Sequence, residues 1–396
     1  MYPKLKNCAL KLTDKRVLYN FVEDELYELD DESFEFLSYC TGKNSFEDIL
    51  LKTGCNKNES LELINYLKKE RCLVFQKDQT ANEKFTVKQN SRPPLKYLLL
   101  HITEKCNLKC RHCYLGEKSN RDLELGLIKK ILNEFGEYGF KLLITGGEPL
   151  LHENFWDILK YARKFPIRIE LLTNGTLIEE EIAERLFKYV NGVQISLDGM
   201  EEGHETLRGR GTFLKTINGI KNAKKYLNVT VATMIHSANM LEFDEMNKLM
   251  RELMVDEWIL DIPAECGNLI KNKELTIDFL HAARIFKEYG YSVGIHAGEE
   301  DYSCGANLCS IDVSGNVTKC GFFDEGVGNI REGKLEDFWK IITREYLPKL
   351  SELDCEDCKV LKNCKGGCRY RALKEGGFYG KDPFMCCLYL DECKIN

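Results

Sequence analysis

The sequence predicts an α/β protein in which a partial (β/α)6 barrel of the TIM type lies between a winged-helix-like module and a cysteine-rich C-terminal domain. Strand-like and helix-like stretches alternate regularly through residues 95–295, and such alternation produces parallel sheets. Residues 300–396 contain ten of the eighteen cysteines. A chain of 396 residues is long enough for two or three domains, and we expect them at 1–85, 95–295 and 300–396.

The first block predicts the winged-helix-like module. Its strand-like runs are residues 9–12, 16–21, 26–29 and 72–75. Three short helical patterns lie between the third and fourth runs, and the first two begin after Asp30 and Ser45 as capping residues. The polar stretch 76–90, which is followed by Pro93 and Pro94, is interpreted as a linker.

The second block supplies six expected βα units. Apolar strand candidates lie at residues 97–102, 141–144, 167–172, 192–197, 229–233 and 258–262. Amphipathic helical stretches separate them, for example residues 123–135 and 178–189. Six such units curve into a partial barrel, and in barrels of this kind the reactive groups lie at the C-terminal ends of the strands.

Composition limits the surroundings and partners of the protein. Hydrophobic residues make up 43% of the chain and charged residues 30%, which is typical of a globular protein. No apolar run approaches the ~20 residues that span a bilayer, and the first residues lack the apolar core of a secretory signal. We therefore expect a cytoplasmic protein without a membrane partner. The net charge of −7 argues against nucleic acid as a partner.

Cysteine is the unusual residue of this composition. The cytosol keeps thiols reduced, so the eighteen cysteines indicate metal ligation or burial, and not disulfides. For the scattered Cys8, Cys40, Cys55 and Cys72 we expect core packing, because free cysteine is among the most often buried residue types.

Cys106, Cys110 and Cys113 follow the first barrel strand with the spacing C-x3-C-x2-C. Three thiolates on one loop can hold three irons of a [4Fe–4S] cube and leave the fourth iron open, and an open position marks a reactive metal site. A zinc knot is the alternative. It requires a fourth ligand nearby, for which His101 and His112 are candidates, although His101 lies within the strand.

Polar turns end the next three strands. These strands run into Gly146-Gly147-Glu148-Pro149, Thr173-Asn174-Gly175 and Ser196-Leu197-Asp198-Gly199. Paired glycines allow a ligand to approach the backbone closely, and a glutamate accepts a hydrogen bond from an ammonium group. Asp198 and Gly199 are interpreted as a turn.

This order of motifs resembles the radical SAM superfamily, whose members cleave S-adenosylmethionine (SAM) to a 5′-deoxyadenosyl radical that removes hydrogen from a substrate. The resemblance implies that Cys106, Cys110 and Cys113 hold the cluster and that SAM chelates its open iron. The implied SAM contacts are His112 at the adenine, Gly146, Gly147 and Glu148 at the methionine amino group, Thr173 and Ser196 on the ribose or carboxylate side, and Arg208 at the carboxylate.

The C-terminal cysteines follow a second pattern. Cys304-x4-Cys309-x10-Cys320 is followed by Cys355-x2-Cys358-x5-Cys364-x3-Cys368 and then by Cys386, with Gly315 before Cys320. A zinc ribbon is the simpler interpretation of C-x2-C. The full set resembles the SPASM extension of radical SAM enzymes, which carries two auxiliary [4Fe–4S] clusters and would bring the total to three.

The SPASM resemblance divides the ligands into two sets of four. Cys304, Cys309, Cys320 and Cys368 would hold one cluster, and Cys355, Cys358, Cys364 and Cys386 would hold the other. Spacing alone does not decide between Cys386 and its neighbour Cys387. Cys266 and Cys393 match no ligand position, and we expect them to be buried.

The N-terminal module resembles the PqqD-like peptide-recognition domain, in which an extended leader peptide adds to a sheet edge. The resemblance implies a maturase of ribosomally made precursor peptides that forms a thioether, a carbon–carbon link or another oxidative modification. A low-potential donor such as flavodoxin or ferredoxin would supply the electron. The acidic run at residues 23–35 is a solvated face or favours a basic peptide.

Three other functions fit parts of the pattern. Sulfatase-maturing enzymes resemble the chain from the barrel onward but carry an aspartate where Gly321 follows Cys320. A haem or other cofactor pathway fits the barrel, but a peptide-recognition module would be superfluous there. A non-catalytic zinc or electron-transfer protein is disfavoured by the three-cysteine loop and the polar turns beside it.

Overall fold

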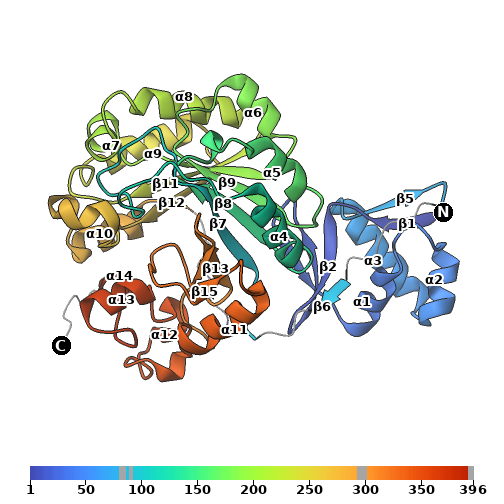
Figure 1. Ribbon diagram of the computed structural model, residues 1–396. Helices are drawn as coiled ribbons and strands as arrows, with labels where there is room; N and C mark the ends of the chain where they lie inside the picture. The colour runs from blue at the N-terminus through green and yellow to red at the C-terminus, as the bar shows by residue number, and fades with distance from the viewer. Residues whose placement is uncertain (80–85, 89–91, 292–300, 391–396) are drawn as a thin grey trace.

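The computed structural model describes residues 1–79, 86–88, 92–291 and 301–390. A nine-stranded sheet forms its centre, the N-terminal module packs at one side of this sheet, and the C-terminal region lies at another (Figure 1). In this part of the chain, no helix combines the length and the apolar character that crossing a membrane requires.

The central sheet contains six parallel strands in chain order, which confirms the expected α/β fold. They are β7 (Tyr97–Thr103), β8 (Lys141–Gly146), β9 (Arg168–Thr173), β10 (Gly192–Ser196), β11 (Asn228–Met234) and β12 (Glu257–Asp261). The helices of this block are α4 (Leu125–Phe135), α5 (Phe155–Ala162), α6 (Glu180–Leu186), α7 (Glu201–Arg208), α8 (Phe213–Lys224), α9 (Phe243–Glu252) and α10 (Phe279–Glu288). Short 3-10 turns lie at η1 (Pro149–Leu151), η2 (Gly267–Lys271) and η3 (Lys273–Leu275).

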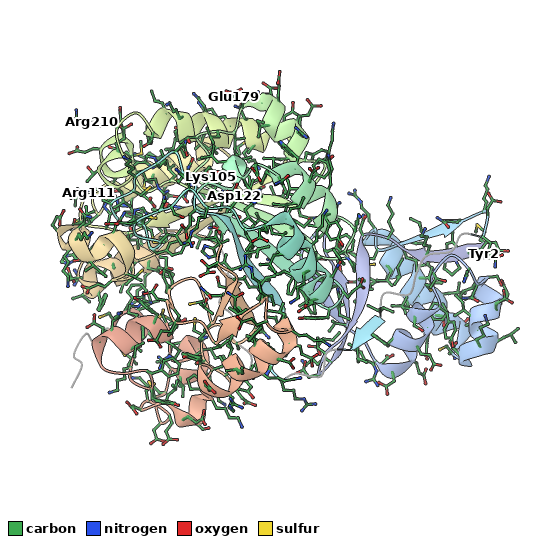
Figure 2. The ribbon with its side chains drawn as sticks, in the orientation of Figure 1. Tyr2, Lys105, Arg111, Asp122, Glu179 and Arg210 are labelled. Carbon is green, nitrogen blue, oxygen red and sulfur yellow. The ribbon has the colours of Figure 1, made fainter. Side chains whose placement is uncertain are left out.

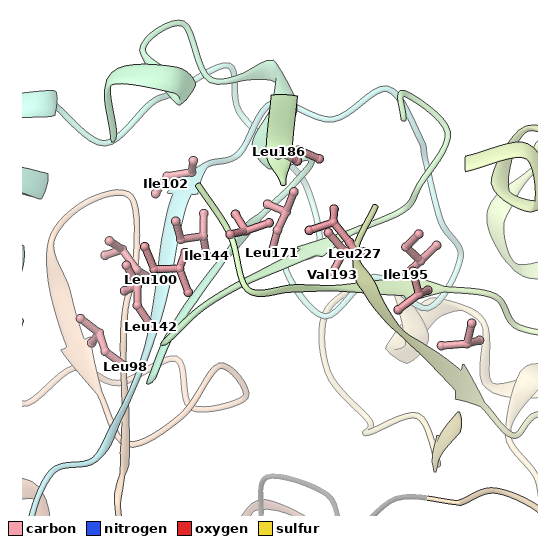
Figure 3. Close-up of a cluster of buried hydrophobic side chains, with 14 of the residues drawn as sticks. Leu98, Leu100, Ile102, Leu142, Ile144, Leu171, Leu186, Val193, Ile195 and Leu227 are labelled. Atoms are coloured by element: carbon pink, nitrogen blue, oxygen red, sulfur yellow. The ribbon is translucent and has the colours of Figure 1, made fainter. Parts of the chain in front are cut away.

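One hydrophobic cluster joins the sheet to the helices that cover its outer face. Leu98, Leu100 and Ile102 of β7 are fully buried in it (Figure 3). Burial of one such side chain stabilises the fold by roughly 1.5–3 kcal/mol. Because successive side chains of a strand point to opposite faces, the intervening residues Leu99 and His101 face the inside of the barrel, where both lie against Gly321.

The sheet continues into the C-terminal region, which the sequence did not predict. β13 (Leu308–Ile311) pairs in parallel with β7, and β14 (Asn316–Thr318) and β15 (Gly328–Asn329) follow as antiparallel neighbours. These strands are too short to show a periodic pattern. The remaining elements are α11 (Leu335–Glu345), η4 (Leu350–Glu352), α12 (Leu361–Cys364), α13 (Arg369–Glu375) and α14 (Pro383–Leu390).

The N-terminal module has the expected order of strands and helices. β2 (Cys8–Leu12), β3 (Arg16–Asn20) and β4 (Glu25–Glu28) form an antiparallel sheet, and α1 (Asp31–Ser38), α2 (Phe46–Thr53) and α3 (Lys57–Lys69) follow. Asp30 and Ser45 cap α1 and α2 as expected. Cys8, Cys40 and Cys72 are buried in the core of the module, and Cys55 is half-buried at its edge.

Two strands of this module differ from the expectation. β5 (Leu73–Gln76) pairs with β1 (Tyr2–Leu5), a strand that the sequence analysis missed. β6 (Thr86–Lys88) lies within the expected linker and pairs in parallel with β2. Residues 86–88 of the expected linker therefore pair with the N-terminal sheet, so this stretch is not only a linker.

The module docks at the end of the barrel where the strands begin. Tyr19 packs against Phe140 with ring centroids 5.0 Å apart, and Asp24 forms an ion pair with Lys141, the first residue of β8. The cysteine loop follows the last residue of β7, so the module and the loop lie at opposite ends of the strands.

Lys11 is buried in this contact and gives a test of it. Its side chain is 1% exposed, and its Nζ donates a hydrogen bond to the carbonyl of Glu137 at 2.8 Å. Burial lowers the pKa of Lys11 to about 7, whereas an unfolded lysine titrates near ~10.4. Between these values the unfolded chain binds more protons, so this group adds stability as the pH rises.

We expect the thermal midpoint of wild-type protein to rise relative to that of Lys11→Met between pH 7 and pH ~10, because each unit of pKa shift corresponds to about 1.4 kcal/mol. Lys57→Met, at an exposed lysine of α3, is the control and should show no such trend. A difference between wild type and Lys11→Met that stays constant over this range would contradict a buried lysine in the docked module.

Candidate active site

Cys106, Cys110 and Cys113 lie in the irregular segment after β7. Cys110 is buried, and the other two are half-buried. Asn268 of η2 holds the backbone of this segment: its Nδ2 donates to the carbonyl of Cys110 at 3.0 Å, and its backbone nitrogen donates to the carbonyl of Cys113 at 2.9 Å. The loop is therefore fixed by a segment that follows it by more than a hundred residues.

The start of the loop is fixed by an ion pair. The Nζ of Lys105 lies 2.6 Å from the Oδ2 of Asp122, and the two residues are seen side by side in Figure 2. The hydroxyl of Thr103, the last residue of β7, donates to the other carboxylate oxygen of Asp122 at 2.5 Å. The direction in which the chain leaves β7 is thus set before the first cysteine.

Lys118 brings a positive charge to the three cysteines. Its Nζ donates to the carbonyl of Leu108 at 3.4 Å. Burial acts to lower the pKa of Lys118, but the nearby sulfurs of Cys113, Cys106 and Cys110 raise it. A cation placed among three thiols fits an anionic iron–sulfur group. The sequence analysis missed Lys118 because it belongs to no recognisable motif.

Gly146 and Gly147 allow the end of β8 to pack against the cysteine loop. A Cβ at Gly146 would lie 2.2 Å from the carbonyl oxygen of Thr103, and a Cβ at Gly147 would lie 2.3 Å from that of Lys105. The backbone nitrogen of Gly147 donates to Thr103 at 2.7 Å, and that of Glu148 donates to Lys105 at 2.8 Å. The close approach that paired glycines permit is therefore made by the protein's own backbone.

Glu148 and Thr173 meet at the ends of β8 and β9. Glu148 is fully buried, and the hydroxyl of Thr173 lies 2.9 Å from both of its carboxylate oxygens. The backbone nitrogen of Asn174 donates to the same carboxylate at 2.9 Å. Burial raises the pKa of Glu148 despite these donors. Ser196 is half-buried at the end of the next strand, β10.

Asp198 is the centre of a buried polar network, so the expectation of a simple turn was wrong. Its side chain is fully buried, its carboxylate pairs with Arg208, and its Oδ1 accepts a hydrogen bond from the backbone nitrogen of Met234 at 2.8 Å. Burial acts to raise the pKa of Asp198, but Arg208 and the neighbouring histidines lower it to about 2. The carboxylate is therefore ionised under all ordinary conditions.

This network reaches the cysteine loop through Arg208 and His112. The Nε2 of His112 lies 4.0 Å from the Oδ2 of Asp198, and Cys110 and Cys113 act electrostatically on Arg208. Burial lowers the pKa of His112 to about 3, and its Nδ1 has no hydrogen-bond partner among the described residues. A buried imidazole nitrogen without a partner is costly, which fits a group that binds beside it.

His101 faces the interior of the barrel close to the cysteine loop. Its ring centroid lies 5.8 Å from that of Tyr114, which directly follows Cys113. Burial lowers the pKa of His101 to about 4, and its Nδ1 has no partner within the described part of the chain. A Cβ at Gly321 would lie 3.6 Å from its Nε2. The interior therefore holds a neutral imidazole between the cysteine loop and the C-terminal region.

The structure brings together three members of the first expected auxiliary set. Cys304 and Cys320 both act electrostatically on the thiol of Cys368, whose pKa burial raises to about 12. Cys266 is 4% exposed, as expected, and lies near Cys113 and Cys320. Cys393 lies outside the described residues.

Cys309 does not join this group, and the ligand role expected for it finds no support in its position. It is fully buried in the main hydrophobic cluster. In the β13–β7 register it lies opposite Leu98, and Ile311 lies opposite Leu100. The alternation of β13 therefore directs Cys309 toward the helices, where it acts on the pKa of Tyr138. Spacing in a sequence does not show which face of a strand carries a cysteine.

All four members of the second auxiliary set line one cavity. Its volume is about 470 Å³, and its lining includes Cys355, Cys358, Cys364 and Cys386. Cys387, the alternative to Cys386, is fully buried in the main hydrophobic cluster. The position of the two side chains favours Cys386 as the ligand.

In the described residues, no three Cys, His, Asp or Glu side chains converge tightly enough to bind a single metal ion. A four-iron cube takes each thiolate on a different iron, so its cysteines need not converge on one point. The three-cysteine loop, its cation and the unpartnered nitrogen beside it fit a [4Fe–4S] cluster and a molecule bound next to it.

Comparison with known families defines the class of the protein. Residues 100–250 match the model of the radical SAM superfamily. The chain therefore carries a radical SAM domain at these residues, the domain of a class of enzymes that uses a [4Fe–4S] cluster and SAM.

Several individual proteins are similar to this chain over more residues than the family model covers. The antilisterial bacteriocin subtilosin biosynthesis protein AlbA of Bacillus subtilis is 27% identical over 392 residues, covering 90% of this chain and 88% of AlbA. An AdoMet-dependent heme synthase of Oleidesulfovibrio alaskensis is 24% identical over 351 residues, covering 75% of this chain and 88% of the synthase. Streptococcus suis SuiB, in its crystal structure with the precursor peptide SuiA, shares the fold with a TM-score of 0.68 and 17% identity, covering 96% of this chain and 98% of SuiB.

The buried network around Asp198 makes a prediction about SAM. Asp198→Asn removes the negative charge that fixes Arg208, and a hydrogen bond to a charged group contributes about 1.5–3 kcal/mol. We expect SAM affinity to fall by roughly 10- to 100-fold, measured by equilibrium dialysis on the iron-loaded protein. Asp157→Asn, at an exposed carboxylate on α5 that pairs with Lys160, is the control. Unchanged affinity in a folded, iron-loaded Asp198→Asn variant would show that the network does not position the SAM site.

Proposed function

We propose that this protein is a radical SAM maturase of ribosomally made peptides. The observation that carries the proposal is the joining of three features in one chain. These are the three-cysteine loop at the C-terminal ends of the barrel strands, a cysteine-lined C-terminal region beside it, and a docked N-terminal module with an open sheet edge. The domains correspond to residues 1–85, 95–295 and 300–396, with residues 86–88 returning to the first.

The chain's residues hold and orient the cofactors. Cys106, Cys110 and Cys113 ligate the cluster, and Lys118 offsets their charge. The bound cluster and SAM together supply a 5′-deoxyadenosyl radical. The remaining contacts follow the family pattern, with Gly146, Gly147 and Glu148 at the amino group of SAM, Thr173, Ser196 and Arg208 toward its ribose and carboxylate, and His112 at the adenine. Burial of Glu148 and Thr173 excludes water from this part of the site.

Two auxiliary clusters complete the cofactor set, which makes three [4Fe–4S] clusters per chain. The cavity lined by Cys355, Cys358, Cys364 and Cys386 holds one of them. Cys304, Cys320 and Cys368 hold the other, and its fourth iron is left to a ligand outside this group because Cys309 faces the hydrophobic core. A low-potential donor such as flavodoxin or ferredoxin supplies the reducing electron.

The N-terminal module offers β4 as the docking edge for a leader peptide. Within the described residues β4 pairs only with β3, and an extended peptide can add to such an edge through main-chain hydrogen bonds. Leu26 is 48% exposed on this strand, and Tyr66 of α3 is 49% exposed and packs against Tyr27 with ring centroids 6.0 Å apart. Apolar side chains of the leader would contact this surface.

The charge of the edge favours a basic leader. Glu25 and Glu28 lie on β4, and Asp31 and Glu32 open the helix that follows. Glu28 and Asp31 already pair with Lys15 and Arg16, so Glu25 and Glu32 are the carboxylates of this edge that would attract lysine and arginine side chains. The interaction should weaken as salt rises, because exposed charges are screened.

The position of the module also limits the substrate. β8 runs six residues from the docking end to the cysteine loop, and a strand rises ~3.3 Å per residue. A peptide bound at β4 must cross a distance on the order of 20 Å to reach the chemistry. The leader-binding segment and the modified residue are therefore separated by at least about six extended residues.

The extent of the matches favours a peptide maturase over a haem-pathway enzyme. The AlbA match covers 90% of this chain and necessarily extends into the N-terminal module, whereas the heme synthase match covers 75%. AlbA acts in the biosynthesis of subtilosin, and SuiB was crystallised with a precursor peptide. A module with a docking edge is useful to an enzyme whose substrate carries a leader.

The first test is production of 5′-deoxyadenosine. Anaerobically reconstituted protein is incubated with SAM and dithionite, and the product is measured by chromatography. We expect wild-type protein to form 5′-deoxyadenosine and Cys106→Ala to form none, because the loop then lacks one cluster ligand. Cys55→Ala, at a half-buried cysteine of the N-terminal module, should retain activity. Equal product from Cys106→Ala and wild type would refute the assignment of the cluster loop.

The second test addresses the peptide. Candidate precursor peptides encoded near the gene are labelled, and their binding is followed by fluorescence anisotropy. Leu26→Asp places a charge on the docking edge and should weaken binding at least about tenfold. Leu51→Asp, at a leucine that is 85% exposed on α2, should leave binding unchanged. Equal effects of the two substitutions would place the leader elsewhere.

A further inference from the structure

Arg369 is a buried cation whose bonded partners are all neutral. It begins α13, and its side chain is 1% exposed. Its Nη1 donates to the carbonyls of Phe378 and Gly380, each at 2.9 Å, and its Nη2 donates to the carbonyl of Gly366. Its Nε is buried and has no hydrogen-bond partner among the described residues.

The nearby carboxylate is already engaged. Asp382 accepts hydrogen bonds from Arg371 at 2.8 and 3.1 Å and from the backbone nitrogen of Cys368 at 2.7 Å. No ion pair joins Arg369 to an acidic residue in the described part of the chain. A buried charge is costly unless it is paired, so the negative charge that balances Arg369 is expected from a bound group.

Cysteines of both auxiliary sets face this guanidinium. Among charged neighbours Asp382, which is already paired with Arg371, acts most strongly on Arg369, and Cys355, Cys304 and Cys368 follow. Cys355 belongs to the set that lines the cavity, and Cys304 and Cys368 belong to the other set. Arg369 is therefore near cysteines of both groups.

We propose that Arg369 is a positive centre shared by the two auxiliary clusters, with its Nε donating a hydrogen bond to a sulfur of one of them. This inference rests on the proposed function, which includes both clusters. A cation and an N–H donor beside a cluster stabilise its reduced, more negative state, so they raise its reduction potential. Arg369 acts through the clusters and is a positioning residue of the electron path.

The sequence offers a matched set of variants. Arg369→Gln removes the charge and keeps a hydrogen-bonding side chain, whereas Arg369→Lys keeps the charge and loses the planar guanidinium group with its several N–H donors. Lys374→Gln removes an exposed cation of the same helix and is the control for charge at the surface. All are made in a chain in which Cys106, Cys110 and Cys113 are replaced by alanine, so that only auxiliary clusters contribute to the signal.

The experiment is an anaerobic redox titration followed by electron paramagnetic resonance, after iron and sulfide have been counted. We expect eight irons per chain in this background. The potentials of both auxiliary signals should be lower in Arg369→Gln, close to wild type in Arg369→Lys and unchanged in Lys374→Gln. Unchanged potentials in a fully loaded Arg369→Gln variant would overturn the inference and leave the proposed function intact.

A low iron content in the Arg369→Gln variant also tests the inference. If the iron-free variant has the wild-type circular dichroism spectrum and Arg369→Lys loads fully, the charge requirement is supported. Equal loss of iron from both variants would indicate packing and overturn the inference. If the background chain with Arg369 intact binds no iron, the auxiliary clusters are refuted, and both this inference and that part of the proposed function are withdrawn.

Discussion

The contact between the cysteine loop and the end of β8 is the constraint on which the rest of the site depends. Gly146 and Gly147 lack the Cβ atoms that would collide with the carbonyls of Thr103 and Lys105, so the two backbones can be joined by hydrogen bonds. This contact places Glu148 at the adjacent strand end, where Thr173 holds its carboxylate. The loop, the glycines and the carboxylate therefore form one rigid unit, and a side chain at either glycine would displace all three.

A second regularity is the pairing of cysteine groups with cations. Lys118 lies among the three loop cysteines, Arg208 faces two of them from α7, and Arg369 faces cysteines of both C-terminal groups. Thiolate ligands bring negative charge into a region of low dielectric, where an opposite charge has a much larger effect than in water. Within the described residues, only Arg208 among these cations is paired with a carboxylate, that of Asp198. The other two are placed where the balancing charge would come from a cluster.

The sequence predicted the parts of the fold that carry strong local patterns. The six barrel strands are apolar runs, and the spacing of the cysteines can be read from the sequence without knowledge of the folded structure. Short strands such as β13 and β15 have no such pattern. The position of Cys309 does not support its expected ligand role, because the spacing of cysteines does not show which face of a strand each one occupies. Lys118 and Asp198 were missed because their roles arise from contacts between segments distant in sequence.

The two ends of the barrel differ in function. The N-terminal module is joined to the start of the strands by a buried lysine, an aromatic contact and an ion pair, while the cofactor residues lie where the same strands end. A module attached by a flexible linker would deliver a peptide over a range of distances, and its effective concentration at the site would be set by the linker. Under the proposed function, a docked module instead fixes the starting point of the peptide, so the length of chain between leader and modified residue would select which residue reaches the radical.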